Sequence, residues 1–304
     1  MAKRKPTLAS IRQRLKHAPQ DWQPRSYIDL GEHLNPVMGH ADKGLPYGCI
    51  CEVSGKPSCG KSVFCGDIAA ACQVQDGADI IWLDCEDSFE QPATEDEGYW
   101  FQKRGLTCHE GAKNFYLIKP YIGKFGSTER LSCAQDMTKE AESLLEALHN
   151  YDPKGKRVLV LDSVANLMPA AMGAAGFDQS MNTEQSLPKF LALLMRRWVP
   201  LFRQYNTVGL FVNQLRENPG QMFGDKTYTP GGNAFKFGAH VRVRMRKIML
   251  LPSAKVKGKI LGIGGRIRND KNKAGGLERS ECDYKILFRG DSKFLPAGTI
   301  KYKK

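Results

Sequence analysis

The sequence contains no apolar segment long enough to cross a membrane. Its 304 residues include no uninterrupted run of about 18 apolar residues, whereas a spanning helix needs about 20. The basic start, MAKRKPTLASIRQRLK, also lacks the apolar stretch of a signal peptide. These absences exclude a membrane span and argue against secretion, so we expect a cytoplasmic protein.

The sequence also lacks the cysteine patterns of a disulfide framework or a zinc site. Its nine cysteines are scattered, with no C-x-x-C pair and no Cys/His cluster at zinc spacing. An odd count without a framework predicts reduced thiols, most of them buried as small hydrophobic side chains. There is no internal repeat and no low-complexity segment. At 41% hydrophobic and 25% charged residues, the composition is that of a globular protein large enough to bury its own core.

The net charge of +13 is unevenly distributed along the chain. Residues 1–25 hold seven Lys/Arg and one Asp, and residues 236–304 hold nineteen Lys/Arg and five Asp/Glu, so the middle is acidic. A basic surface is typical of nucleic-acid binding. Charge alone leaves a second interpretation equally open, in which the basic residues only keep the surface solvated.

The hydrophobic pattern predicts an α/β protein with a parallel sheet covered on both faces. Short apolar strands alternate with helices, which is typical of such sheets. We expect strands over 49–55, 78–84, 156–162 and 207–214, and helices over 61–76, 134–150 and 187–205. The alternating stretches 240–250 and 282–288 predict antiparallel strands added at one sheet edge. A basic helix over 7–18 and a Pro-containing linker would form residues 1–27, with the main domain over 28–304.

A phosphate-binding loop is predicted where the first of these strands meets its helix. Its eight residues match the pattern G-x-x-x-x-G-K-[ST]: Gly55, Lys56, Pro57, Ser58, Cys59, Gly60, Lys61 and Ser62. The glycines let backbone N–H groups point at a phosphate, and the helix N-terminus adds partial positive charge. Lys61 would reach the β- and γ-phosphates of ATP, and the Ser62 hydroxyl would hold Mg²⁺.

Polar residues at the ends of the other strands complete a candidate site. With the phosphate loop upstream, we expect Asp162 to contact Mg²⁺, the alternative being an acid that caps the helix that follows. Glu86 is the candidate that activates the attacking water, with Asp84 as competitor, since strand alternation would place both on one face. Gln214 could bond the γ-phosphate and report nucleotide state to the next loop, or could be a satisfied amide at the end of a strand.

Several segments of the sequence resemble the RecA-type recombinases, including their phage UvsX branch. The matching segments are GKPSCGKS, WLDCED, VLVLDSVANL, FVNQLR, QMFG, PGGNAFKF and NDKNKAGG, within about residues 30–290. The resemblance implies a RecA-like ATPase core using ATP and Mg²⁺ in a bacterial or phage-infected cell. It implies a homo-oligomer on single-stranded DNA, either a helical filament or a ring. That assembly would pair with double-stranded DNA and exchange strands in recombination and repair.

The resemblance also assigns roles to individual residues. Glu86 matches the catalytic glutamate and Gln214 the γ-phosphate sensor, while Lys271 and Lys273 match lysines that reach the ATP of a neighbouring subunit. Lys236, Phe237 and Arg242 match residues of the subunit interface. Two loops, 166–184 and 216–232, would face DNA, and their matching residues are Met181, Arg216, Phe223, Lys226, Tyr228, Gly231, Gly232 and Asn233.

The sequence departs from the family pattern at several points. Cys59 replaces a small hydroxyl residue, and Glu217-Asn218-Pro219 replaces basic and apolar residues of the second loop. The chain also ends soon after the core, without the C-terminal domain and acidic tail of the bacterial proteins. A hexameric helicase on the same core and an ATP-binding mediator that loads another recombinase are the two alternatives.

Overall fold

A computed structural model describes residues 25–90, 101–102, 105–125, 128–170, 186–217, 227–253, 257–258, 260–287 and 300–303. The helix expected over 7–18 and the DNA-loop residues Met181, Phe223 and Lys226 lie outside these ranges. Among the described helices, none is both long and apolar enough to cross a membrane.

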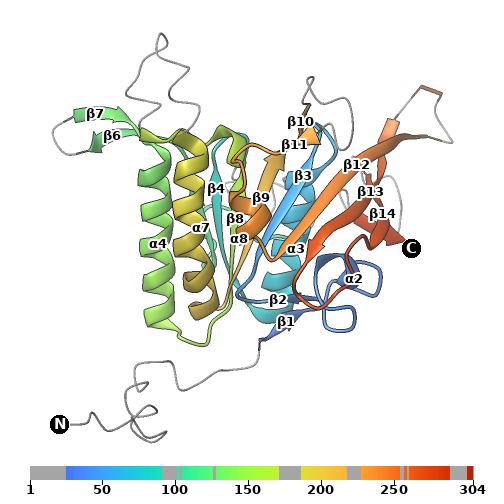
Figure 1. Ribbon diagram of the computed structural model, residues 1–304, viewed down its shortest axis with the longest axis horizontal. Helices are drawn as coiled ribbons and strands as arrows, with labels where there is room; N and C mark the ends of the chain where they lie inside the picture. The colour runs from blue at the N-terminus through green and yellow to red at the C-terminus, as the bar shows by residue number, and fades with distance from the viewer. Residues whose placement is uncertain are drawn as a thin grey trace, which may run out of the picture.

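A mixed sheet forms the centre of the molecule (Figure 1). Its described strands run in the order β15-β14-β13-β12-β3-β9-β8-β4-β5. The parallel part comprises β3 (Ile50–Gly55), β4 (Asp79–Asp84), β5 (Phe115–Ile118), β8 (Arg157–Asp162) and β9 (Thr207–Gln214), joined by the start of β12 (Val241–Pro252). The antiparallel part adds β13 (Ile260–Asn272), β14 (Glu281–Leu287) and β15 (Ile300–Lys303). The predicted α/β class with antiparallel edge strands is therefore confirmed.

Helices cover both faces of the sheet because its central strands are apolar on both sides. Trp82 of β4 packs into one core with α3 (Lys61–Asp76), and its neighbour Leu83 packs into the other. The second core lies under α4 (Ala134–Tyr151) and α7 (Ser186–Gln204), which run side by side in Figure 1. Successive strand residues point to opposite faces, so each strand serves two cores.

Shorter elements close the ends of the sheet. β1 (Tyr27–Ile28), β2 (Leu45–Pro46) and α2 (Asn35–Met38) lie at the lower right in Figure 1. At the upper end are the hairpins β6 (Ile122–Phe125) with β7 (Thr128–Leu131) and β10 (Arg216–Glu217) with β11 (Thr227–Tyr228). A 3₁₀ turn, η4 (Val164–Asn166), follows β8, and the short helix α8 (Ala234–Gly238) precedes β12.

The cysteine prediction is confirmed. All nine cysteines are free thiols, and eight of them are buried, the exception being the half-buried Cys85. They pack as small side chains in the core and form no cross-link, so no disulfide contributes to its stability.

Arg157, at the start of β8, connects the chain segments at the lower end of the sheet through hydrogen bonds. The residue is fully buried, and its guanidinium donates to the carbonyl oxygens of Gly155, Tyr205, Leu148 and Asp152. These carbonyls lie at the ends of α4 and α7 and in the turns beside them. One planar cation thus adds a charged donor to four carbonyls around these helix ends, three of which also accept a bond from a neighbouring residue.

We predict that Arg157→Met lowers the free energy of unfolding by about 3 kcal/mol, because four carbonyls each lose the bond from the buried guanidinium. Urea denaturation monitored by circular dichroism measures this change. Arg197→Met is the matched control, since the exposed Arg197 pairs with Glu142 at the surface and its loss should cost less than about 1 kcal/mol. Equal losses in the two variants would contradict the role given to Arg157.

Candidate nucleotide site

The phosphate loop has the strand–turn–helix geometry that its sequence predicts. It leaves β3 at Gly55 and enters α3 at Lys61, and Gly60 at the helix N-cap has φ +89°. An L side chain rarely adopts that φ, so glycine is needed there. Lys61 is buried, and its Nζ donates to the carbonyl of Lys56 at 3.1 Å. The cation is therefore held across the inside of the loop.

Ser62 and Asp162 form an oxygen donor pair beside this loop. Asp162 is 3% exposed, and burial raises the pKa of its carboxyl to about 6, with the charges of Glu86 and Asp84 adding to the rise. A hydrogen bond from the Ser62 hydroxyl opposes that shift. Hard oxygen donors suit Mg²⁺, which takes few protein ligands and completes its shell with phosphate and water. The described residues contain no group of three or more His, Cys, Asp or Glu that could hold a metal.

The turn after β4 separates the roles of Asp84 and Glu86. Asp84 is fully buried, and its carboxylate accepts hydrogen bonds from the backbone N–H groups of Glu86 and Phe89, the latter at 2.6 Å. Glu86 is exposed, and its Oε1 accepts from Ser163 Oγ at 2.5 Å and from Gln214 Nε2 at 3.3 Å. The expectation that strand alternation puts both acids on one face is wrong, because β4 ends at Asp84. Asp84 builds the turn, and Glu86 lies exposed on it, bonded to Ser163 and Gln214.

The predicted residues therefore lie at the ends of four neighbouring strands, along one edge of the sheet. Their order β3-β9-β8-β4 places the phosphate loop, Gln214, Asp162 and Glu86 side by side at the carboxyl ends. In open parallel sheets this edge is where ligands bind. A backbone bond from Leu215 N to the Gly55 carbonyl, at 3.1 Å, also joins the end of β9 to the start of the loop.

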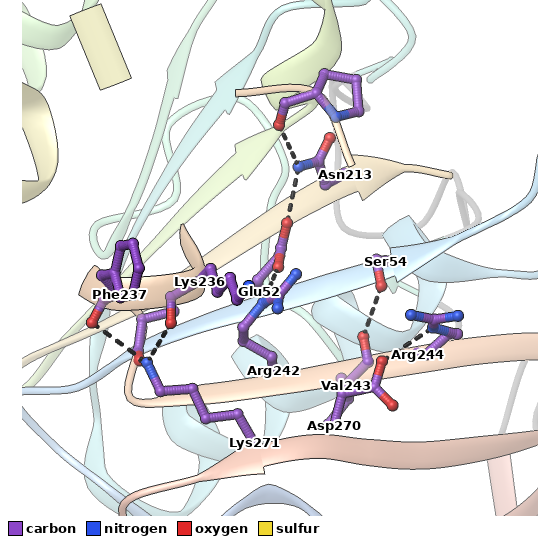
Figure 2. Close-up of polar contacts among 12 residues, drawn as sticks. Glu52, Ser54, Asn213, Lys236, Phe237, Arg242, Val243, Arg244, Asp270 and Lys271 are labelled. Carbon is purple, nitrogen blue, oxygen red and sulfur yellow. Dashed lines mark hydrogen bonds and ion pairs between the residues drawn. The ribbon is translucent and has the colours of Figure 1, made fainter. Parts of the chain in front are cut away.

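A buried carboxylate behind this edge was missed by sequence reasoning. Glu52 of β3 is fully buried, accepts from Asn213 Nδ2 at 2.8 Å, and forms an ion pair with Arg242 of β12 (Figure 2). The Asn213 amide also donates to the carbonyl of Pro230. The sequence does contain an indication of this carboxylate, since Glu52 is the only charged residue in the apolar strand CICEVSG. Arg242, which the family resemblance places at a subunit interface, pairs with this acid within its own chain.

Lys271 caps the C-terminal end of α8 within its own chain. Its Nζ donates to the carbonyl oxygens of Lys236, Phe237 and Ala239 (Figure 2). Burial, followed by the charges of Lys273 and Arg242, lowers the pKa of Lys271 to about 8. Lys236 and Phe237 themselves face solvent, and Phe237 is 71% exposed. A groove beside them is lined by Phe237, His240, Lys273 and residues of α7.

The stem of the second predicted loop lies against the phosphate loop. Arg216 and Tyr228 are exposed and pair across β10 and β11, next to the pair formed by Glu217 and Thr227. Glu217 forms an ion pair with Lys56 at 2.7 Å, and this interaction lowers the pKa of the glutamate. The departure noted at Glu217 in the sequence is therefore matched by the lysine inside the phosphate loop. Gly231, Gly232 and Asn233 follow the stem, with positive φ at both glycines.

A face of four arginines extends from this stem along the antiparallel strands. Arg244 lies opposite Arg268, and Arg246 lies opposite Arg266, in the register of β12 and β13. Like charges in such positions repel, and Asp270 offsets this by pairing with both Arg244 and Arg268. Arg244 Nη1 also donates to Thr227 Oγ1 of β11. Alternating arginines in VRVRMRK are the sequence signal for this face.

Comparison with known proteins shows which family the chain belongs to. A model of the RecA N-terminal domain family matches residues 101–290, and the chain belongs to that family. The sequence is 28% identical over 280 residues to a protein from Clostridium beijerinckii called Protein RecA. That match covers 88% of this chain and 68% of the relative.

The environment of Lys271 gives a prediction about its reactivity. Because its pKa is lowered to about 8, the amine is charged below that pH and neutral above it, whereas a solvated lysine titrates near pH 10.4. Acylation requires the neutral amine. At pH 8.5 we expect Lys271 to be acetylated at least about tenfold faster than the exposed Lys154, as measured by peptide mass spectrometry. A labelling midpoint near pH 10 for Lys271 would show that the ammonium is not destabilised by burial.

Proposed function

We propose that this protein is an ATP-dependent DNA recombinase that assembles on single-stranded DNA and exchanges strands with a homologous duplex. The observation that carries the proposal is the convergence of Lys61, Asp162, Glu86 and Gln214 at adjacent strand ends. Membership of the RecA N-terminal domain family supports it, as does the name of the Clostridium beijerinckii relative.

In this proposal the chain hydrolyses ATP by positioning and by neutralising charge. The loop Gly55–Ser62 cradles the phosphates, and Lys61 places its cation on the β- and γ-phosphates. Ser62 and Asp162 hold Mg²⁺, which supplies charge neutralisation on the same oxygens when bound. Glu86 orients and deprotonates the attacking water, and its contacts to Ser163 and Gln214 hold the carboxylate in place.

Gln214 is proposed to pass nucleotide state to the DNA loop. It bonds Glu86 on one side, and the next residues form the stem that Glu217 ties to Lys56. The neighbouring Asn213 holds the other end of the same loop through Pro230. Both ends of the loop therefore contact residues of the nucleotide site.

DNA is proposed to lie along the upper edge of the sheet. Arg216 and Tyr228 offer a cation and an aromatic ring on adjacent strands, the combination that single-strand binding uses. The four-arginine face continues from there and would neutralise the phosphates of a second strand. Phe223, Lys226 and Met181 remain candidates for base and phosphate contacts.

The nucleotide is proposed to lie between subunits of a filament, with Lys271 and Lys273 reaching it from the neighbour. This requires Lys271 to leave the carbonyls of α8 that it caps in the isolated chain. The exposed Phe237 and Lys236 on the same helix would then pack against that neighbour. Assembly should consequently protect Lys271 from acetylation.

Glu86→Gln tests the proposed reaction. It keeps the shape of the side chain but removes the base, so ATP hydrolysis should fall at least about a hundredfold while ATP binding is retained. Lys61→Ala should lose hydrolysis as well as tight ATP binding. Asp87→Asn, which removes a charge from the same turn where Asp87 pairs with Lys119, is the control and should keep parent activity. Steady-state ATPase assays with single-stranded DNA measure all three, and parent rates in Glu86→Gln would refute the assignment.

The two exposed stem residues are expected to affect DNA binding differently. Arg216→Ala should weaken single-strand binding and reduce the salt slope by about 0.7, because one phosphate contact is lost. Tyr228→Ala should cost about 1–3 kcal/mol with an unchanged slope, because stacking releases no counterions. Fluorescence anisotropy over a salt series measures both, with Lys154→Ala at the opposite end of β8 as control. Parent-like binding in both variants would move the DNA site away from this stem.

A further inference from the structure

Tyr284 of β14 contacts the phosphate loop, although it lies 225 residues from it in the sequence. The side chain is 1% exposed, and its hydroxyl donates to the carbonyl of Cys59 at 2.6 Å. Burial raises the pKa of the phenol, so the hydroxyl keeps its proton and remains a donor. The Tyr284 side chain can reach the phosphate loop because it lies opposite Gly265 of β13. A Cβ at Gly265 would meet the phenol oxygen at 2.5 Å, so only glycine lets the ring lie there.

A second side chain of β14 contacts the next residue of the loop. Ile286 occupies the space where a Cβ on Gly60 would lie, and it packs there beside Ile263. Tyr284 and Ile286 point to the same face of the strand because they are two residues apart. One strand therefore fixes both residues that flank the Cys59–Gly60 peptide bond.

The direction of this peptide unit matters for anion binding. In a trans peptide the C=O and the following N–H point in opposite directions. Holding the Cys59 carbonyl toward β14 therefore turns the N–H of Gly60 away from β14. Backbone N–H groups are what such loops offer a phosphate. Gly60, at φ +89°, has the backbone freedom to let this peptide rotate. A hydrogen bond that holds the Cys59 carbonyl therefore restricts that rotation.

We propose that Tyr284 is a positioning residue of the phosphate site, which orients the Cys59–Gly60 peptide so that the Gly60 N–H faces the β-phosphate of a bound nucleotide. The proposal rests on the proposed ATPase function. It concerns a residue in the antiparallel extension of the sheet, outside the strand-end residues already described. It predicts that affinity for phosphorylated nucleotides depends on one hydroxyl of β14.

The chain provides a matched control in Tyr47. This tyrosine is also 1% exposed, and its hydroxyl donates to Asp76 Oδ2 at 2.9 Å at the far end of α3. Tyr47→Phe and Tyr284→Phe each delete one buried hydroxyl and keep the ring. A loss of general stability should be similar in the two variants, whereas a loss of phosphate affinity should occur in only one.

The experiment measures ATP and ADP affinity by isothermal titration calorimetry, and KM and kcat in the DNA-stimulated ATPase assay. Tyr284→Phe should raise both dissociation constants and KM about fivefold or more, since one backbone donor is no longer preoriented, and should change kcat less. Tyr47→Phe should stay within about twofold of the parent. Hydrogen exchange of the peptide containing Gly60 should be faster in Tyr284→Phe alone.

The outcomes separate this proposal from the proposed function. If the parent protein binds ATP and Tyr284→Phe matches it in affinity and exchange, the positioning role is wrong while the ATPase assignment stands. If Tyr47→Phe loses as much affinity as Tyr284→Phe, general loosening explains the effect and the positioning role is again refuted. If the parent binds no nucleotide, the proposed function fails and the positioning role fails with it. Circular dichroism at the assay temperature checks that each variant is folded. Hydrogen exchange of the peptide containing Gly60 is therefore measured on folded protein.

Discussion

A single buried carboxylate, that of Glu52, determines how the upper half of this sheet is arranged. A charge removed from water is costly unless it is paired and hydrogen-bonded. Glu52 meets this requirement with Arg242 on one neighbouring strand and Asn213 on the other. The acid therefore links β12, β3 and β9 at the level where the phosphate loop and the second loop begin. Removing either partner would leave a charge without compensation inside the sheet.

Through these contacts of Glu52, the strand ends that hold the residues of the nucleotide site are linked to one another. Asn213 contacts Pro230, so the segment returning to α8 is tied to the same carboxylate. Lys271 then ties α8 to β13. Figure 2 shows the two groups of contacts side by side: Asn213 with Glu52 and Pro230, and Lys271 with the carbonyl oxygens of α8. A network of this kind has few intermediate arrangements, which suits a site that must respond to a ligand.

The sequence was sufficient for the fold and for the strand-end residues, because both depend on local patterns. Apolar strands followed by glycine or acid predict the sheet and its ligand edge, and the observed boundaries differ from the expected ones by one or two residues in most elements. Glu86 and Asp84 could not be separated beforehand, because the turn that distinguishes them depends on the backbone N–H of Phe89. The inward turn of Arg242 and the contact from Tyr284 to Cys59 also escaped prediction, since both join residues far apart in the chain.

The paired stem of β10 and β11 has an entropic consequence for the segment between its strands. The register pair of Glu217 with Thr227 brings the two ends of residues 218–226 together. Lys56 holds one end and Arg244 holds the other. Closing a loop normally costs conformational entropy that grows slowly with its length. Because the stem already holds Glu217 and Thr227 together, the cost of closing this loop arises on folding and not on the binding of a partner.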